Sequence, residues 1–108
     1  MSLIEKSALS DDQIMACIDR GLDRVGPNVK YLVYWHLQKI GHIKRADIPN
    51  NPESFVAALR GLYRESAAGV ERAIVQEINM TFGLSLSMNE IVKAIDEARQ
   101  KIERTTVI

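Results

Sequence analysis

The stretch from Asn28 to Gly41, NVKYLVYWHLQKIG, places the strongest constraint on how this chain can fold. It contains the only tryptophan of the sequence, two of its three tyrosines and five aliphatic residues. Read as a helix, the stretch is apolar on most of its surface, which is typical of a helix inside a domain. We therefore expect Asn28–Ile40 to be a central helix that contacts neighbours on several sides.

Apolar residues spaced three and four positions apart predict four further helices. The first covers about Asp11–Val25, the second begins at Asn51, and the third carries apolar residues from Val70 to Phe82. The last has an apolar row at Met88, Ile91, Ile95, Ala98 and Ile102. No alternating apolar run predicts a strand. The sequence thus predicts an all-α bundle of about five helices in one domain spanning residues 1–108.

Local motifs suggest where these helices begin and end. Ser10–Gln13 and Ser87–Glu90 have the S-x-x-Q and S-x-x-E forms of capping boxes, which satisfy free N–H groups at a helix start. Asn51 precedes a proline and is expected to cap the next helix. Gly41 and Gly83 are expected to end helices in the left-handed conformation.

The length, charge and cysteine content of the chain argue against several classes of protein. A chain of 108 residues can bury a core without a disulfide or a metal. Its formal net charge of zero argues against a general polyanion-binding protein. It contains no run of 18 apolar residues and no secretory signal. The single cysteine, Cys17, lies on a helical apolar stripe and is expected to be a buried thiol. We therefore expect a cytoplasmic protein without a cofactor.

Candidate catalytic groups are few. No nucleophile-elbow, phosphate-loop or Cys-x-x-Cys motif occurs in the sequence. His36 and His42 are six residues apart, with Gly41 between them, so they cannot form a metal-binding pair on one helical face. We interpret His36 as a half-buried structural histidine, for which Glu71 is a candidate partner. The sequence predicts no catalytic, cofactor or metal site, and hence no enzyme.

The apolar row from Met88 to Ile102 has two interpretations. It is shorter than the three to four heptads typical of a coiled coil, so we favour an amphipathic helix packed on the bundle. The alternative is a contact between two copies of the chain in a homodimer, or a connection to a coiled coil in a larger signalling chain.

Positive charge gathers in residues 26–45, which contain four lysines and arginines and no acidic residue. Lys39, Lys44 and Arg45 form a candidate contact for an anion or a nucleic acid. We favour a solvated helix end, where cations also interact well with the helix dipole. So few charges, without exposed aromatic residues between them, are a small electrostatic signal for nucleic-acid binding.

The predicted helix that begins at Asn51 and the one that carries Val70–Phe82 have the spacing of a helix-turn-helix. Arg60, Arg64 and Arg72 could contact phosphates there. The second helix of this pair, however, offers Glu71 and Glu77, which do not favour an approach to DNA.

The chain also resembles a known family. The shared pattern is an aromatic-x-His-Leu segment followed by apolar positions and a glutamate near the start of a later helix: Tyr34-Trp35-His36-Leu37, Ile43, Ile48-Pro49, Phe55, Leu59 and Glu71. On these residues, about 20 to 84 resemble the Nitrosopumilus-type output domains of archaeal signalling proteins. The chain departs from the pattern at Leu62-Tyr63-Arg64, where relatives have Phe-Gly.

This resemblance implies an all-helical domain that transmits or receives a signal through protein contacts. It brings no catalytic or ligand-binding residues, and only His36 and Glu71 transfer, as a buried polar pair. Together with the balanced charge, it leads us to expect a cytoplasmic protein-interaction or signalling output module that binds a protein partner or itself. The alternative is a helix-turn-helix DNA-binding regulator.

Overall fold

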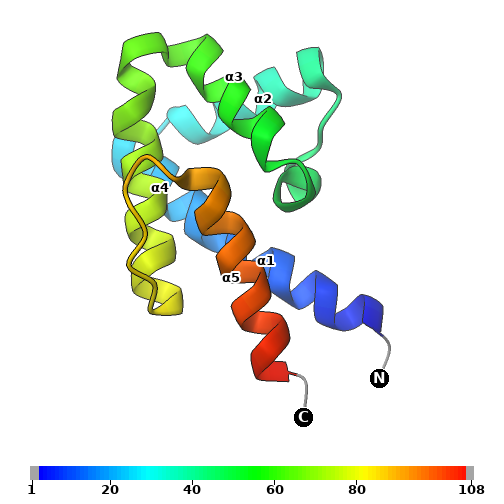
Figure 1. Cartoon of the computed structure of the whole chain (residues 1–108). Helices are drawn as coiled ribbons and strands as arrows, with labels where there is room; N and C mark the ends of the chain where they lie inside the picture. The colour runs from blue at the N-terminus through cyan, green and yellow to red at the C-terminus, as the bar shows by residue number, and fades with distance from the viewer. Residues whose placement is uncertain (1–2, 107–108) are drawn as a thin grey trace.

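A computed structural model describes the backbone of residues 3–106 and the side chains of residues 11–102. Its elements are α1 (Leu3–Val25), α2 (Val29–Gly41), the short 3-10 helix η1 (Arg45–Asn50), α3 (Pro52–Tyr63), the 3-10 turn η2 (Arg64–Ser66), α4 (Ala67–Phe82) and α5 (Ile91–Thr106). The predicted fold class, an all-α bundle of five helices, is confirmed, and residues 3–106 form no strand. Figure 1 shows α1 crossing behind α4 and α5, with α2 and α3 at the upper end of the molecule.

The contact between α1 and α4 is the centre of the molecule. It is close because Gly21 of α1 has no side chain: a β-carbon at this residue would lie 2.8 Å from the Cα atom of Ile74 in α4. Helix α5 packs against both of these helices, and α3 packs against α4 and α5. All five α-helices and η1 contribute to one continuous apolar core, whose fully buried side chains include Ile14, Ile18, Leu22, Val33, Ile48, Phe55, Leu59, Ile74, Ile78, Ile91 and Ile95.

Helix α2 is not the central helix, so this part of the prediction is wrong. Only Val33 and Leu37 are buried among its residues. Tyr31, Leu32 and Trp35 are 68%, 46% and 58% exposed. The central position belongs to α1, whose 23 residues are long enough to contact α2, η1, α4 and α5. The apolar composition of a helix indicates how much its burial would stabilise the fold. It does not indicate how many other helices pack against it.

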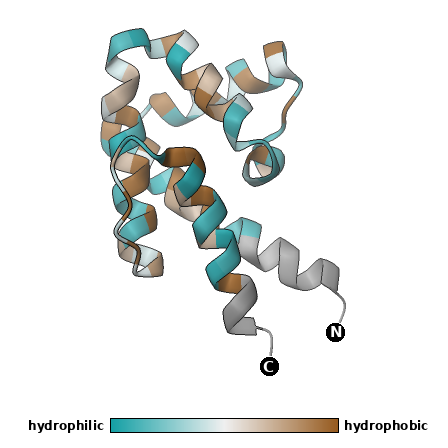
Figure 2. Cartoon of the chain, in the orientation of Figure 1, coloured by the Kyte–Doolittle hydropathy of each residue, from teal (hydrophilic) through white to brown (hydrophobic). Residues whose placement is uncertain are grey.

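Figure 2 shows apolar and polar residues interspersed along α2 to α5, as expected for helices that each bury one side. The apolar side of α5 faces the core of the same protomer. Ile91, Ile95 and Ala98 are no more than 1% exposed, while Met88 and Ile102 are partly buried. The middle of this row thus packs in the core of the protomer, as the favoured interpretation expects, and is not exposed to a second copy.

Both predicted capping boxes are wrong. Helix α1 begins at Leu3, so Ser10–Gln13 lies within it, where the preceding turn already satisfies the N–H groups. Helix α5 begins at Ile91, and Ser87–Glu90 is a turn before it, closed by the Glu90 N–H donating to the Ser87 carbonyl at 3.0 Å. Asn51 does precede α3, but its side-chain amide donates to the Asp47 carbonyl and makes no cap.

The predicted helix ends are partly right. Helix α4 ends at Gly83, whose φ of 66° is the expected left-handed conformation. At the end of α2 this conformation falls on His42, with φ 54°, and Gly41 is still helical. Arg64 has φ 49° at the junction between α3 and η2, which is unusual for a residue other than glycine. The backbone therefore turns sharply at Arg64, between α3 and η2.

Candidate functional site

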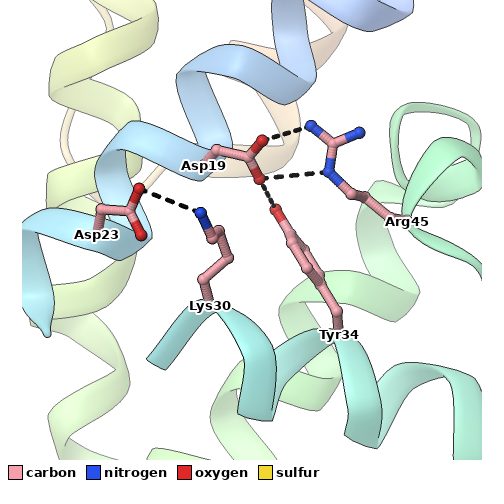
Figure 3. A network of polar contacts seen from close by, with 5 residues as sticks. All are labelled: Asp19, Asp23, Lys30, Tyr34 and Arg45. Atoms are coloured by element: carbon pink, nitrogen blue, oxygen red, sulfur yellow. Dashed lines mark hydrogen bonds and ion pairs between the residues drawn. The ribbon is translucent and has the colours of Figure 1, made fainter. Parts of the chain in front are cut away.

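A polar network fixes the orientation of α2 on α1 (Figure 3). The Tyr34 hydroxyl donates a hydrogen bond to the Asp19 carboxylate of α1, and Arg45 of η1 forms an ion pair with the same carboxylate. About one turn away, the Lys30 ammonium of α2 lies 3.3 Å from an Asp23 carboxylate oxygen of α1. Two aspartates of α1 therefore hold both α2 and η1 in place.

This orientation turns an aromatic surface outward. Successive residues of a helix are rotated by about 100°, so Tyr31, Leu32 and Trp35 lie opposite the buried Val33 and Leu37. We call these three exposed residues the α2 face. Four of the six large hydrophobic side chains that are exposed among residues 11–102 belong to α2, the fourth being Ile40. Tryptophan and tyrosine are enriched in protein contact surfaces, so this concentration marks the α2 face as the candidate functional site.

The charges around the α2 face are positive. Lys39 is exposed one turn after Trp35, and Lys44 is exposed just beyond the end of α2. Neither lysine forms an ion pair with another residue of the described part of the chain. Lys30 is held by Asp23, and its ammonium lies 5.2 Å from the centroid of the Tyr31 ring.

The predicted anion contact at Lys39, Lys44 and Arg45 is therefore only partly assembled. Arg45 forms an ion pair with Asp19, and its guanidinium lies 6.0 Å from the Tyr34 ring centroid. Within residues 11–102, this leaves only Lys39 and Lys44 of the three without an ion pair. The expectation that no exposed aromatic residues accompany these charges is wrong, because Tyr31 and Trp35 are exposed on the same helix.

Burial raises the pKa of Tyr34 well above its ordinary value of 10.0, and the hydrogen bond to Asp19 and the charge of that carboxylate raise it further. The positive charge of Arg45 only partly offsets this. Ionised Tyr34 would place a phenolate beside a carboxylate in a half-buried position, so the folded protein retains the phenolic proton.

The stability of the folded protein should consequently fall at alkaline pH. Below pH 10 both the folded and the unfolded protein keep the Tyr34 proton, so the stabilisation is fully present. As the pH rises above 10, the unfolded chain loses this proton first, and stability falls by up to about 1.4 kcal/mol per pH unit. We expect Tyr34→Phe to lose less stability than the wild type from about pH 9 to pH 11, measured by urea denaturation. Tyr31→Phe, which removes an exposed hydroxyl, is the matched control. Parallel curves for wild type and Tyr34→Phe would contradict the buried network.

The predicted pair of His36 and Glu71 is wrong. Glu71 is 4% exposed, but its partner is Arg60 of α3, whose Nε and Nη2 each lie 3.4 Å from a carboxylate oxygen. His36 is half-buried on α2, whose main neighbours are α1 and α3. The burial of a carboxylate near the start of α4 was predicted correctly. The helix that supplies its positively charged partner was not.

Cys17 is fully buried, as predicted. Burial raises the pKa of its thiol, which keeps it protonated, and Arg20 Nη2 lies 3.5 Å from the sulfur. A buried, protonated thiol is a poor nucleophile. Among the described residues, no three histidine, cysteine, aspartate or glutamate side chains are grouped in a way that could hold a metal ion.

The three arginines of the helix-turn-helix alternative do come together. Arg60, Arg64 and Arg72 line one open pocket between α3 and α4, but Glu65 and Glu71 line the same pocket. The carboxylates offset much of the positive charge that a phosphate backbone would need. The α3–η2–α4 unit is thus a mixed-charge surface.

The residues that matter most here were missed from the sequence. Nothing in the spacing of Asp19, Tyr34 and Arg45 indicates that they meet, because each comes from a different element. The α2 face had a usable signal, since Trp35 and Tyr31 are of the residue types enriched in contact surfaces. That signal was outweighed by the apolar character of the whole stretch.

Comparisons with family models, curated proteins and solved structures found no match to this chain. The resemblance to archaeal output domains therefore stays a prediction. None of the helices in residues 3–106 is both long and apolar enough to cross a membrane.

Proposed function

We propose that this protein is a protein-interaction module that binds its partner through the α2 face and has no catalytic activity of its own. The observation that carries the proposal is the exposure of Tyr31, Leu32 and Trp35 on one side of a helix whose other side is firmly held. Exposed aromatic residues on a rigid element lose little conformational entropy on binding, which is why they contribute strongly to protein contacts.

The setting proposed for this contact is cytoplasmic signalling, and its support is the resemblance to archaeal output domains. A helix-turn-helix DNA-binding regulator has weaker support. Glu65 and Glu71 accompany the arginines of that unit, and Arg60 is already engaged with Glu71. The three residues of the α2 face include no carboxylate, so no negative charge there opposes the proposed contact.

A peptide selection tests the proposal. The folded protein is immobilised and used to select from a display library of amphipathic helical peptides, and the affinities of selected peptides are measured by fluorescence anisotropy. We expect peptides whose affinity falls by about 30-fold, equivalent to about 2 kcal/mol, for Trp35→Ala, because truncating a central aromatic residue removes a large share of the contact.

Met80→Ala is the matched control for this experiment. Met80 is 73% exposed on α4, so the substitution also removes an exposed apolar side chain, but on a different helix. Selected peptides should bind Met80→Ala as tightly as the wild type. Peptides that bind Trp35→Ala and wild type equally well, or a selection that enriches nothing, would contradict a docking role for the α2 face.

A further inference from the structure

The cations that border the α2 face are the starting point for identifying its partner. Lys39 and Lys44 are exposed, and within residues 11–102 neither has an acidic partner. Residues 26–45 contain no acidic residue at all. Asp19 and Asp23 of α1 are already engaged with Arg45 and Lys30. Asp47 of η1 follows Lys44 by three residues, but within residues 11–102 no ion pair joins its carboxylate to either lysine. An apolar surface with an unpaired positive border is complementary to an apolar surface with a negative border.

A second copy of the chain does not fit this surface well. Tyrosine and tryptophan bury about 150–250 Å² each when fully covered, so the exposed parts of the α2 face offer roughly 300 Å². This is less than the area of about 800 Å² per partner in a stable interface, so the contact is a transient one whichever protein binds. In a symmetric dimer the same positive border would also meet itself, and like charges facing each other weaken association.

A single-stranded nucleic acid also stacks on exposed aromatic rings, but it fits less well than a protein. Leu32 is exposed beside the aromatic residues, and an aliphatic side chain has no favoured role in base stacking. Two unpaired lysines neutralise few phosphates, and the chain as a whole carries no net positive charge.

We propose that the partner of the α2 face is an acidic amphipathic helix of another protein. Its apolar side packs along Tyr31, Leu32 and Trp35, and its glutamates or aspartates lie beside Lys39 and Lys44. The 13 residues of α2 form a rod of about 20 Å, which a neighbouring helix can follow side by side. This inference rests on the proposed function, because it specifies the chemistry of the partner that binds there.

Two peptide libraries test the charge of the partner. Both have the same apolar positions at helical spacing, but the remaining positions of one are Glu, Asp, Ser and Gln, and those of the other are Lys, Arg, Ser and Gln. We expect the peptides that require Trp35 to come from the acidic library. Lys39→Glu combined with Lys44→Glu should weaken them by roughly three- to tenfold at low salt, with a smaller effect at high salt. A separate selection against the same double variant should instead enrich peptides from the basic library.

The outcomes separate this inference from the proposed function. Trp35-dependent peptides drawn equally from both libraries would overturn the acidic partner and leave the interaction module standing. No Trp35-dependent peptide from either library would overturn both. Light scattering on the protein alone should show a monomer, and a dimer that dissociates on Trp35→Ala would assign the face to a second copy. Trp35-dependent binding of a 25-nucleotide oligothymidylate that is tighter than that of any selected peptide would assign it to a nucleic acid.

Discussion

Phe55→Ala is expected to lower the free energy of unfolding by about 3–5 kcal/mol, because it leaves a cavity in the core. Trp35→Ala should change it by no more than about 0.5 kcal/mol. Phe55 of α3 has no exposed surface and is among the largest fully buried side chains, whereas Trp35 is 58% exposed. The larger aromatic residue thus contributes less to stability. Urea denaturation of both variants measures this difference directly.

The comparison with Trp35→Ala decides between two descriptions of the fold. If α2 were the central helix, removing its tryptophan would cost several kcal/mol, as expected for a buried aromatic residue. A cost for Trp35→Ala equal to that for Phe55→Ala would therefore contradict both the peripheral position of α2 and its role as a docking surface. If Trp35→Ala is stable, in contrast, a loss of peptide binding by this variant can be assigned to the missing side chain and not to unfolding.

Gly21→Ala should destabilise the protein by about 1–3 kcal/mol, even though alanine is the better helix former. The new methyl group would stand 2.8 Å from the Cα atom of Ile74 and 2.9 Å from its Cγ1 atom. Backbone cannot move aside as a flexible side chain does, so α1 and α4 must separate. Because these helices form the central contact, the loss of packing extends beyond the substituted residue.

Gly61→Ala provides the matched control. Gly61 also lies inside an α-helix, but a β-carbon there would meet no atom within 4 Å. The substitution should stabilise the protein by about 0.5–1 kcal/mol through helix propensity alone. Thermal unfolding should therefore shift in opposite directions for the two glycine variants. A stabilised Gly21→Ala variant would show that α1 and α4 are not in close contact at residue 21.

The sequence by itself determined the helical fold and most of the core. The apolar spacing of Ile14, Ile18 and Leu22 predicted the buried side of α1, and Ile91, Ile95 and Ala98 did the same for α5. Cys17 was correctly placed among these residues. Such predictions succeed because a helix repeats every 3.6 residues, so the periodicity of the apolar residues identifies the side that gains from burial.

The tertiary structure alone decided which helix is central and which side of α2 is exposed. Helix α2 has apolar residues on almost every side, so their spacing does not indicate which side of the helix is buried. Its orientation follows from the hydrogen bond of Tyr34 to Asp19 and the ion pair of Lys30 with Asp23, contacts across two helices that local spacing does not specify. The partner of Glu71 was decided in the same way, by the approach of α3. Helical periodicity is a local property, whereas the choice between burying and exposing Trp35 depends on which neighbours occupy the space around it.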